Sequence, residues 1–125
     1  MTTHYKTTSF KISSGLEKMV HERMISEGYG LRGKSKWIND AIHYFLAMEI
    51  DLCIDAIIEA SFLEKLDKVV SFRPTPESSQ LISDWLIKVR KVNPELEGVK
   101  SNIIRAAITQ TIIQKCDPSE LKTGV

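Results

Sequence analysis

The amino-acid sequence contains two similar stretches, and this internal repeat limits the folds open to the chain more than any other feature. Residues 7–13 (TTSFKIS) match residues 69–75 (VVSFRPT) at an offset of 62. Further along, residues 34–42 (KSKWINDAI) match residues 100–108 (KSNIIRAAI) at an offset of 66. The change in offset falls in a predicted loop, where insertions cost little free energy. We therefore expect two units of the same design in one chain.

Each unit is predicted to open with a β-strand. In residues 7–13 the side chains alternate, so that Phe10 and Ile12 share one face and polar side chains occupy the other, which is typical of a half-buried strand. Phe72 takes the place of Phe10 in residues 69–75. We expect the two strands to pair antiparallel with each other, with both phenylalanines turned towards the core.

A helix is predicted directly after each strand. In the first unit the capping-box sequence begins at Ser14, and in the second Thr75 precedes a proline at the first helical position. Glycines at 28 and 30 and the Asn93-Pro94 pair are expected to end these helices. Apolar residues at helical spacing predict the buried stripes, namely Leu16, Met19, Val20 and Met24 in the first helix and Leu81, Ile82, Trp85, Leu86 and Val89 in the second.

A second helix is predicted to open in each unit at a serine preceded by a lysine. Ser35 and Ser101 occupy these positions and are expected to be the N-caps. The helix that opens at Ser35 either continues unbroken past Leu46 into the apolar residues beyond or bends there, and the sequence leaves both alternatives open.

Charge is distributed unevenly along the chain. The net charge is only +1, but residues 46–67 hold six acidic residues and one lysine, a net charge of −5, which leaves +6 for the remainder. The sequence has no apolar run of about eighteen residues and no secretory signal pattern, so a cytoplasmic location is expected. Cys53 and Cys116 have no partner at metal-ligand spacing and are expected to serve in packing.

The sequence offers no catalytic constellation. His4, His21 and His43 have no neighbouring nucleophile or paired ligand, and neither a glycine-rich phosphate loop nor a serine elbow is present. We expect a protein that is not an enzyme, with no metal, cofactor or small-molecule substrate.

A strand, a capped helix, a short loop and a serine-started helix with the sequence SNIIRAAI at 101–108 together resemble the ribbon-helix-helix superfamily of the Arc, MetJ and CopG type. Two such units in one polypeptide are similar to TraY proteins of conjugative plasmids. The resemblance implies a mainly α fold with a two-stranded antiparallel β-ribbon, in which the units co-fold as a pseudo-dimer. The expected organisation is a first unit at 1–48, an acidic apolar helical connector at 49–67, a second unit at 68–116 and a tail at 117–125.

The resemblance implies binding of double-stranded DNA, with the ribbon in the major groove and the starts of the second helices on the phosphates. A two-stranded ribbon fits that groove, and positive helix ends favour anions. The expected base-reading residues are Thr7, Ser9, Lys11, Val69, Ser71 and Arg73. The expected phosphate-binding residues are Lys34, Ser35, Lys36, Lys100 and Ser101. The acidic connector should lie away from the DNA, where it packs on the core or also joins copies on tandem sites.

Several functions share this fold. The first expectation is a transcriptional repressor or regulator, and the second is a TraY-like accessory protein at the transfer origin of a plasmid or mobile element. From a different class, an antitoxin or protein-binding module would capture a partner through the connector, and a helical scaffold would bind no nucleic acid. A DNA-binding protein should lose affinity steeply as salt rises, whereas a scaffold should show no such affinity.

Overall fold

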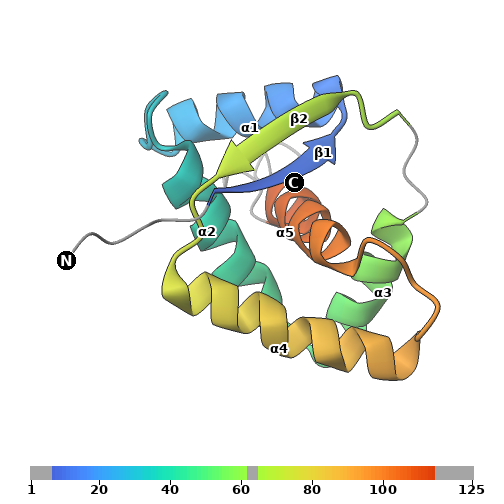
Figure 1. Cartoon of the computed structure of the whole chain (residues 1–125). Coiled ribbons are helices and arrows are strands. Elements are labelled where there is room, and N and C mark those ends of the chain that lie inside the picture. Colours follow the sequence, from blue (N-terminus) through green and yellow to red (C-terminus); the bar gives the residue numbers. More distant parts are fainter. Residues whose placement is uncertain (1–6, 62–64, 115–125) are drawn as a thin grey trace, which may run out of the picture.

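The computed structural model describes residues 7–61 and 65–114, which form five helices and one two-stranded antiparallel sheet (Figure 1). The elements are β1 (Thr8–Ile12), α1 (Ser14–Ser26), α2 (Lys34–Leu46), α3 (Ile50–Ala60), β2 (Lys68–Phe72), α4 (Pro76–Val92) and α5 (Val99–Gln114). The order strand, helix, helix therefore occurs twice, with α3 between the two occurrences. We call β1, α1 and α2 the first unit and β2, α4 and α5 the second unit. The expected mainly helical class with one antiparallel ribbon is confirmed, whereas His4, Cys116 and the predicted tail lie outside the described residues.

The two strands pair antiparallel within the one chain, as predicted. Ser9 lies opposite Ser71, Phe10 opposite Val70 and Lys11 opposite Val69. Because Ser9 and Ser71 are also equivalent in the sequence repeat, the pairing is centred on matching residues. The ribbon thus has an approximate twofold axis through its central pair, although its two strands differ in sequence.

One face of the ribbon belongs to the hydrophobic core. Phe10, Ile12, Val70 and Phe72 are all buried, and the rings of the two phenylalanines meet edge to face with their centroids 5.9 Å apart. Aromatic pairs favour this arrangement because the positive ring edge meets the negative ring face. The inward orientation predicted for both phenylalanines is confirmed.

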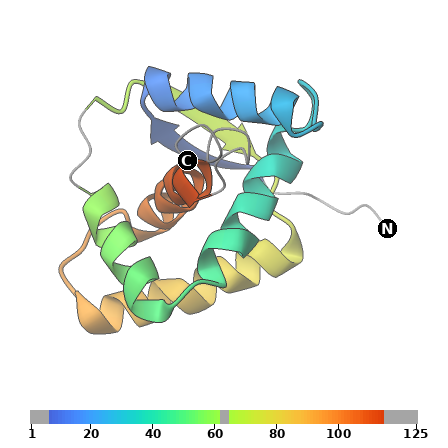
Figure 2. The same cartoon turned by 180° about the vertical axis from the view of Figure 1, so that it is seen from behind.

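Helix α5 lies at the centre of the fold. It packs against α1, α2, α3, α4 and β1, and in Figures 1 and 2 it lies between α1 on one side and α4 on the other. Every residue from 102 to 108 is buried, which explains why this sequence shows an almost continuous apolar run rather than a one-sided stripe. The strands and the surrounding helices are therefore built around one shared core.

The start of α1 differs from the prediction by one residue. Ser13 is the N-cap, since its hydroxyl accepts a hydrogen bond of 3.1 Å from the amide of Leu16. Ser14 instead donates from its hydroxyl and its amide to the Asp67 carboxylate, at 2.6 and 3.0 Å. These two bonds lower the pKa of the Asp67 carboxyl. The side chain of Ser14 thus ties the first unit to the residue before β2.

The predicted apolar stripe of α1 is only partly buried. Val20 and Met24 belong to the core and Leu16 is half-buried, but Met19 is 51% exposed. In α4 the predicted cap is confirmed, because the Thr75 hydroxyl accepts from the amide of Ser78 at 3.1 Å.

Neither predicted serine is the N-cap of a second helix. Helix α2 begins at Lys34 with Gly33 as its N-cap, and α5 begins at Val99, two residues before Ser101. A side chain at Gly33 would bring its Cβ to 2.5 Å from the carbonyl oxygen of Tyr29, so the turn before α2 needs a glycine. A backbone turn at Gly33 therefore starts α2, and the hydroxyl of Ser35 is available for another hydrogen bond.

The connector contains a separate helix. The chain bends at residues 47–49, and α3 then packs against α5 and α2. Cys53 is fully buried on α3, where its thiol donates to the carbonyl oxygen of Phe45 at 3.2 Å, and this burial raises the thiol pKa. The packing role predicted for this cysteine is confirmed.

No helix in residues 7–61 and 65–114 has the length and apolar character to span a bilayer.

We predict that Phe72→Ala lowers the free energy of unfolding by about 3 to 5 kcal/mol, because it leaves a cavity under the ribbon. The matched control is Val69→Ala in the same strand, whose side chain is 65% exposed and should matter by no more than about 0.5 kcal/mol. Guanidinium unfolding followed by circular dichroism measures both. Equal effects would show that the inward face of the ribbon does not belong to the core.

Candidate nucleic-acid interface

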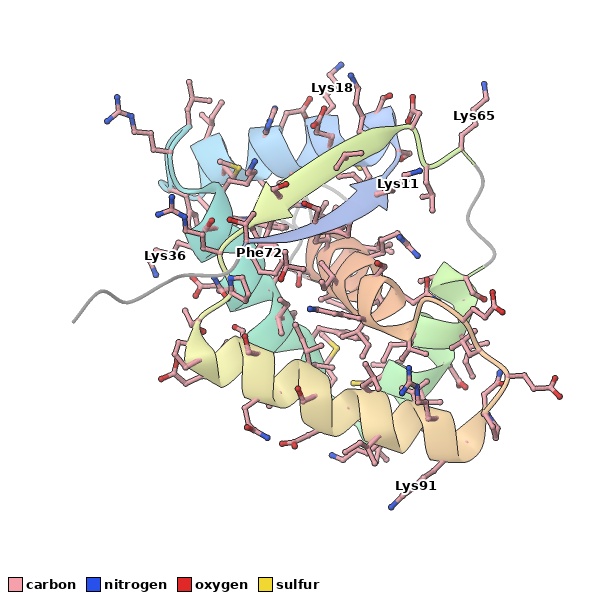
Figure 3. The ribbon with its side chains drawn as sticks, in the orientation of Figure 1. Lys11, Lys18, Lys36, Lys65, Phe72 and Lys91 are labelled. Atoms are coloured by element: carbon pink, nitrogen blue, oxygen red, sulfur yellow. The ribbon has the colours of Figure 1, made fainter. Side chains whose placement is uncertain are left out.

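The face of the ribbon opposite the core carries the residues predicted to read bases. Thr7, Ser9, Lys11, Val69 and Arg73 are exposed and Ser71 is half-buried. They alternate with the inward residues along each chain segment, as the period-two pattern predicted. Figure 3 shows Lys11 on this ribbon and Lys91 at the far side of the molecule, beyond α4.

The centre of this face is formed by two serines. The hydroxyls of Ser9 and Ser71 are hydrogen-bonded to each other at 2.7 Å across the strand pair. Each hydroxyl therefore has already used part of its hydrogen-bonding capacity. Lys11 in β1 and Arg73, directly after β2, each lie two residues from this centre and are the two cationic side chains among the predicted base-reading residues.

The end of β2 is held by a helix of the other unit. The amide of Arg73 donates to the Ser35 hydroxyl at 3.0 Å, and its carbonyl oxygen accepts from the Asn39 side chain at 2.9 Å. Asn39, which is buried in α2, also accepts a 3.0 Å hydrogen bond from the amide of Thr75. Both contacts to Arg73 use its backbone, so its guanidinium takes no part in the anchoring.

The end of β1 is held in the same way by α5. The Nη1 atom of Arg105 donates to the carbonyl oxygen of Lys11 at 3.0 Å, and Nη2 donates to the Asn102 side chain. Asn39 and Arg105 are equivalent in the repeat, as are Arg73 and Lys11. Each unit therefore fixes the backbone of the cationic residue that belongs to the other unit.

Arg105 is an unusual side chain for such a position. It is 7% exposed, and none of the ion pairs among the described residues includes it. Its Nε atom is buried and has no hydrogen-bond partner in the described part of the chain, and desolvation lowers the pKa of the guanidinium. An arginine nevertheless stays protonated in proteins, so a positive charge lies beneath the end of β1.

The predicted phosphate-binding residues differ in whether their side chains are already engaged within the protein. Lys36 is exposed but lies 3.4 Å from the Asp40 carboxylate and over the ring of Tyr29. Tyr29 donates to Asp40 at 2.5 Å, and burial together with this bond raises the pKa of Tyr29 to about 12. The Ser35 hydroxyl accepts from Arg73. Lys34, Lys100 and Ser101 stand at the starts of α2 and α5 as predicted.

A hollow of about 400 Å³ joins the two predicted groups of residues. It lies between the outward face of the ribbon and the start of α5, and its lining includes Ser9, Lys11, Val69, Gly98, Ser101 and Arg105. Predicted base-reading and phosphate-binding residues thus lie side by side at this end of the ribbon. An anion there would face both Lys11 and the positive end of a long helix.

Sequence reasoning missed Asn39, Asn102 and Arg105 as functional residues. A signal for two of them was present, because Asn39 and Arg105 are polar residues at aligned positions, flanked on both sides by apolar residues that the repeat shares. A polar side chain that must be buried requires a partner, and here the partner is the backbone of a strand. The two histidines in the described residues, His21 and His43, are exposed.

Comparisons with family models, with curated proteins and with solved structures found no match to this chain.

We predict that Asn39→Ala lowers the free energy of unfolding by about 2 to 3 kcal/mol, because it removes the side-chain partners of the Arg73 carbonyl and the Thr75 amide. The control is Gln80→Ala, which removes an exposed 2.9 Å hydrogen bond to Asp84 and should cost no more than about 0.5 kcal/mol. Urea unfolding measures both. An Asn39 variant as stable as the Gln80 variant would contradict the anchoring role.

Proposed function

We propose that the chain is a sequence-specific double-stranded DNA-binding protein, made of two ribbon-helix-helix units that form a pseudo-dimer, and that it regulates transcription. The observation that carries the proposal is the outward face of β1 and β2. There Lys11 and Arg73 are exposed while their backbones are anchored by Arg105 and Asn39. A rigid ribbon with exposed cationic side chains suits the recognition of base edges.

The chemistry of the face matches the major groove. The planar guanidinium of Arg73 can bond to O6 and N7 of one guanine together, whereas Lys11 offers a single flexible cation. Val69, which lies opposite Lys11, can contact a thymine methyl group. One half of the ribbon thus presents an arginine and the other a lysine beside a valine. A single molecule should therefore prefer a site whose two halves differ.

The starts of α2 and α5 supply the sequence-independent part of the binding. Lys34 and Lys100 are the first and second residues of these helices, where unpaired backbone amides already favour an anion. Contacts to phosphates fix the orientation of a protein on the duplex and carry no sequence information. Ser101 adds a hydroxyl beside the same hollow as Lys11.

The position of α3 agrees with this orientation. Its acidic side chains Asp51, Asp55 and Glu59 are exposed, and α3 carries no basic residue. In both Figures 1 and 2 it lies apart from β1 and β2, near the end of α4. Phosphates would repel this acidic surface, so it belongs on the side away from the duplex.

The test begins with selection of a binding site from random duplex DNA by the full-length protein. On the selected site, Arg73→Ala should cost about 1 to 3 kcal/mol of binding free energy and much less on unrelated DNA, because the lost contact is to a base. Lys100→Ala should weaken binding to both DNAs alike and reduce the salt dependence. Fluorescence anisotropy over a range of salt concentrations measures these quantities.

Lys91→Ala is the charge-matched control, since it removes one exposed lysine from the end of α4 far from the ribbon (Figure 3). It should leave both affinities nearly unchanged. Failure to select any site, or equal effects of Arg73→Ala, Lys100→Ala and Lys91→Ala, would contradict the proposal. The Arg73→Ala variant keeps the backbone hydrogen bonds to Ser35 and Asn39, so a loss of affinity should not come from loss of the fold.

A further inference from the structure

A second hollow, of about 360 Å³, lies on the other side of β1, between its end, α1 and α5. Its size is within the range of small-molecule sites, about 300 to 1,000 Å³. The apolar side chains Ile12, Leu16, Met19 and Leu66 form most of its wall. None of the residues predicted to contact DNA lines it.

Arg105 is the one charged residue among those that line this hollow. Its side chain is more than nine-tenths buried, and its Nε donor has no hydrogen-bond partner among residues 7–61 and 65–114. A buried charge without a counter-ion is costly, and an unpaired buried donor adds to that cost. A ligand that brought an anionic group to the guanidinium of Arg105 would supply the missing counter-ion and lower this cost.

We propose that this hollow binds a small monocarboxylate with a short unbranched apolar chain, whose carboxylate pairs with Arg105 and whose chain packs against Leu16, Met19 and Leu66. The charge of the guanidinium selects an anion, and the apolar wall selects the chain. Thr109, which also lines the hollow, offers a hydroxyl as a further hydrogen-bond donor. The exposure of Met19 at 51% places it where the hollow meets solvent.

This site is connected to the ribbon through Arg105. The same guanidinium donates to the carbonyl oxygen of Lys11 at 3.0 Å, and Ile12 contributes both to the wall of the hollow and to β1. A bound carboxylate would share Arg105 with the end of that strand. The binding itself requires no DNA, so the test below is independent of the function proposed above.

The experiment is isothermal titration calorimetry of the full-length protein with octanoate at neutral pH, with octan-1-ol as a neutral probe of the same chain length. We expect one octanoate per molecule and at least about tenfold weaker binding of octan-1-ol, which cannot form the ion pair. Octylammonium should not bind, because its charge has the same sign as that of Arg105.

Two variants test the location without disturbing the core. Met19→Asp places a negative charge at the mouth of the hollow and should weaken octanoate binding at least about tenfold. Its matched control is Ile25→Asp, on the same helix and 61% exposed but outside the hollow, which should bind as the unaltered protein does. Gly15→Leu should also weaken binding, since a Cβ at Gly15 meets no atom within 4 Å and the added side chain can occupy the hollow.

Three results would overturn the proposal. The first is no binding of octanoate at millimolar concentration, and the second is binding of octan-1-ol as tight as that of octanoate, since the arginine would then play no part. The third is equal octanoate affinity in the Met19→Asp and Ile25→Asp proteins, because the ligand would then bind elsewhere.

Discussion

A ribbon of only two strands is not stable by itself in water, and the whole structure depends on how β1 and β2 are held. One face is buried through Phe10 and Phe72, and the ends are fixed by Asn39 and Arg105. Each of these two polar side chains comes from the opposite unit. The end of each strand is therefore held by the opposite unit, and both units pack against α5.

The same arrangement separates support from recognition. The anchoring hydrogen bonds reach the backbones of Arg73 and Lys11, so their exposed side chains take no part in these bonds and can face a ligand. A binding site built on a rigid strand holds its groups more precisely than one on a mobile loop. Because the repeat has diverged at these positions, the backbone of the ribbon is nearly symmetric while its outward side chains differ, which fits the recognition of unlike half-sites proposed above.

The sequence allowed prediction of the features that depend on periodicity and repetition. Alternation gave the inward orientation of Phe10 and Phe72, and the repeat indicated that the strands pair within the chain. Features that depend on local geometry were not predictable in this way. The sequence has serine at both 13 and 14, and only the local backbone decides that Ser13 is the cap of α1. Likewise Ser35 is not the cap of α2, because Gly33 takes that position, and its hydroxyl bonds to Arg73 instead. The sequence did not indicate that Arg105 would donate to the carbonyl oxygen of Lys11, which is far from it in the chain.

The most direct test of the central claim is amide chemical-shift mapping of the full-length protein on titration with duplex DNA selected by it. The account predicts that perturbations concentrate at residues 7–12 and 68–73 and at the starts of α2 and α5, while the exposed face of α3 stays unchanged. Perturbations centred on α3, or an unperturbed ribbon in a saturated complex, would contradict the claim that the anchored strands form the contact surface.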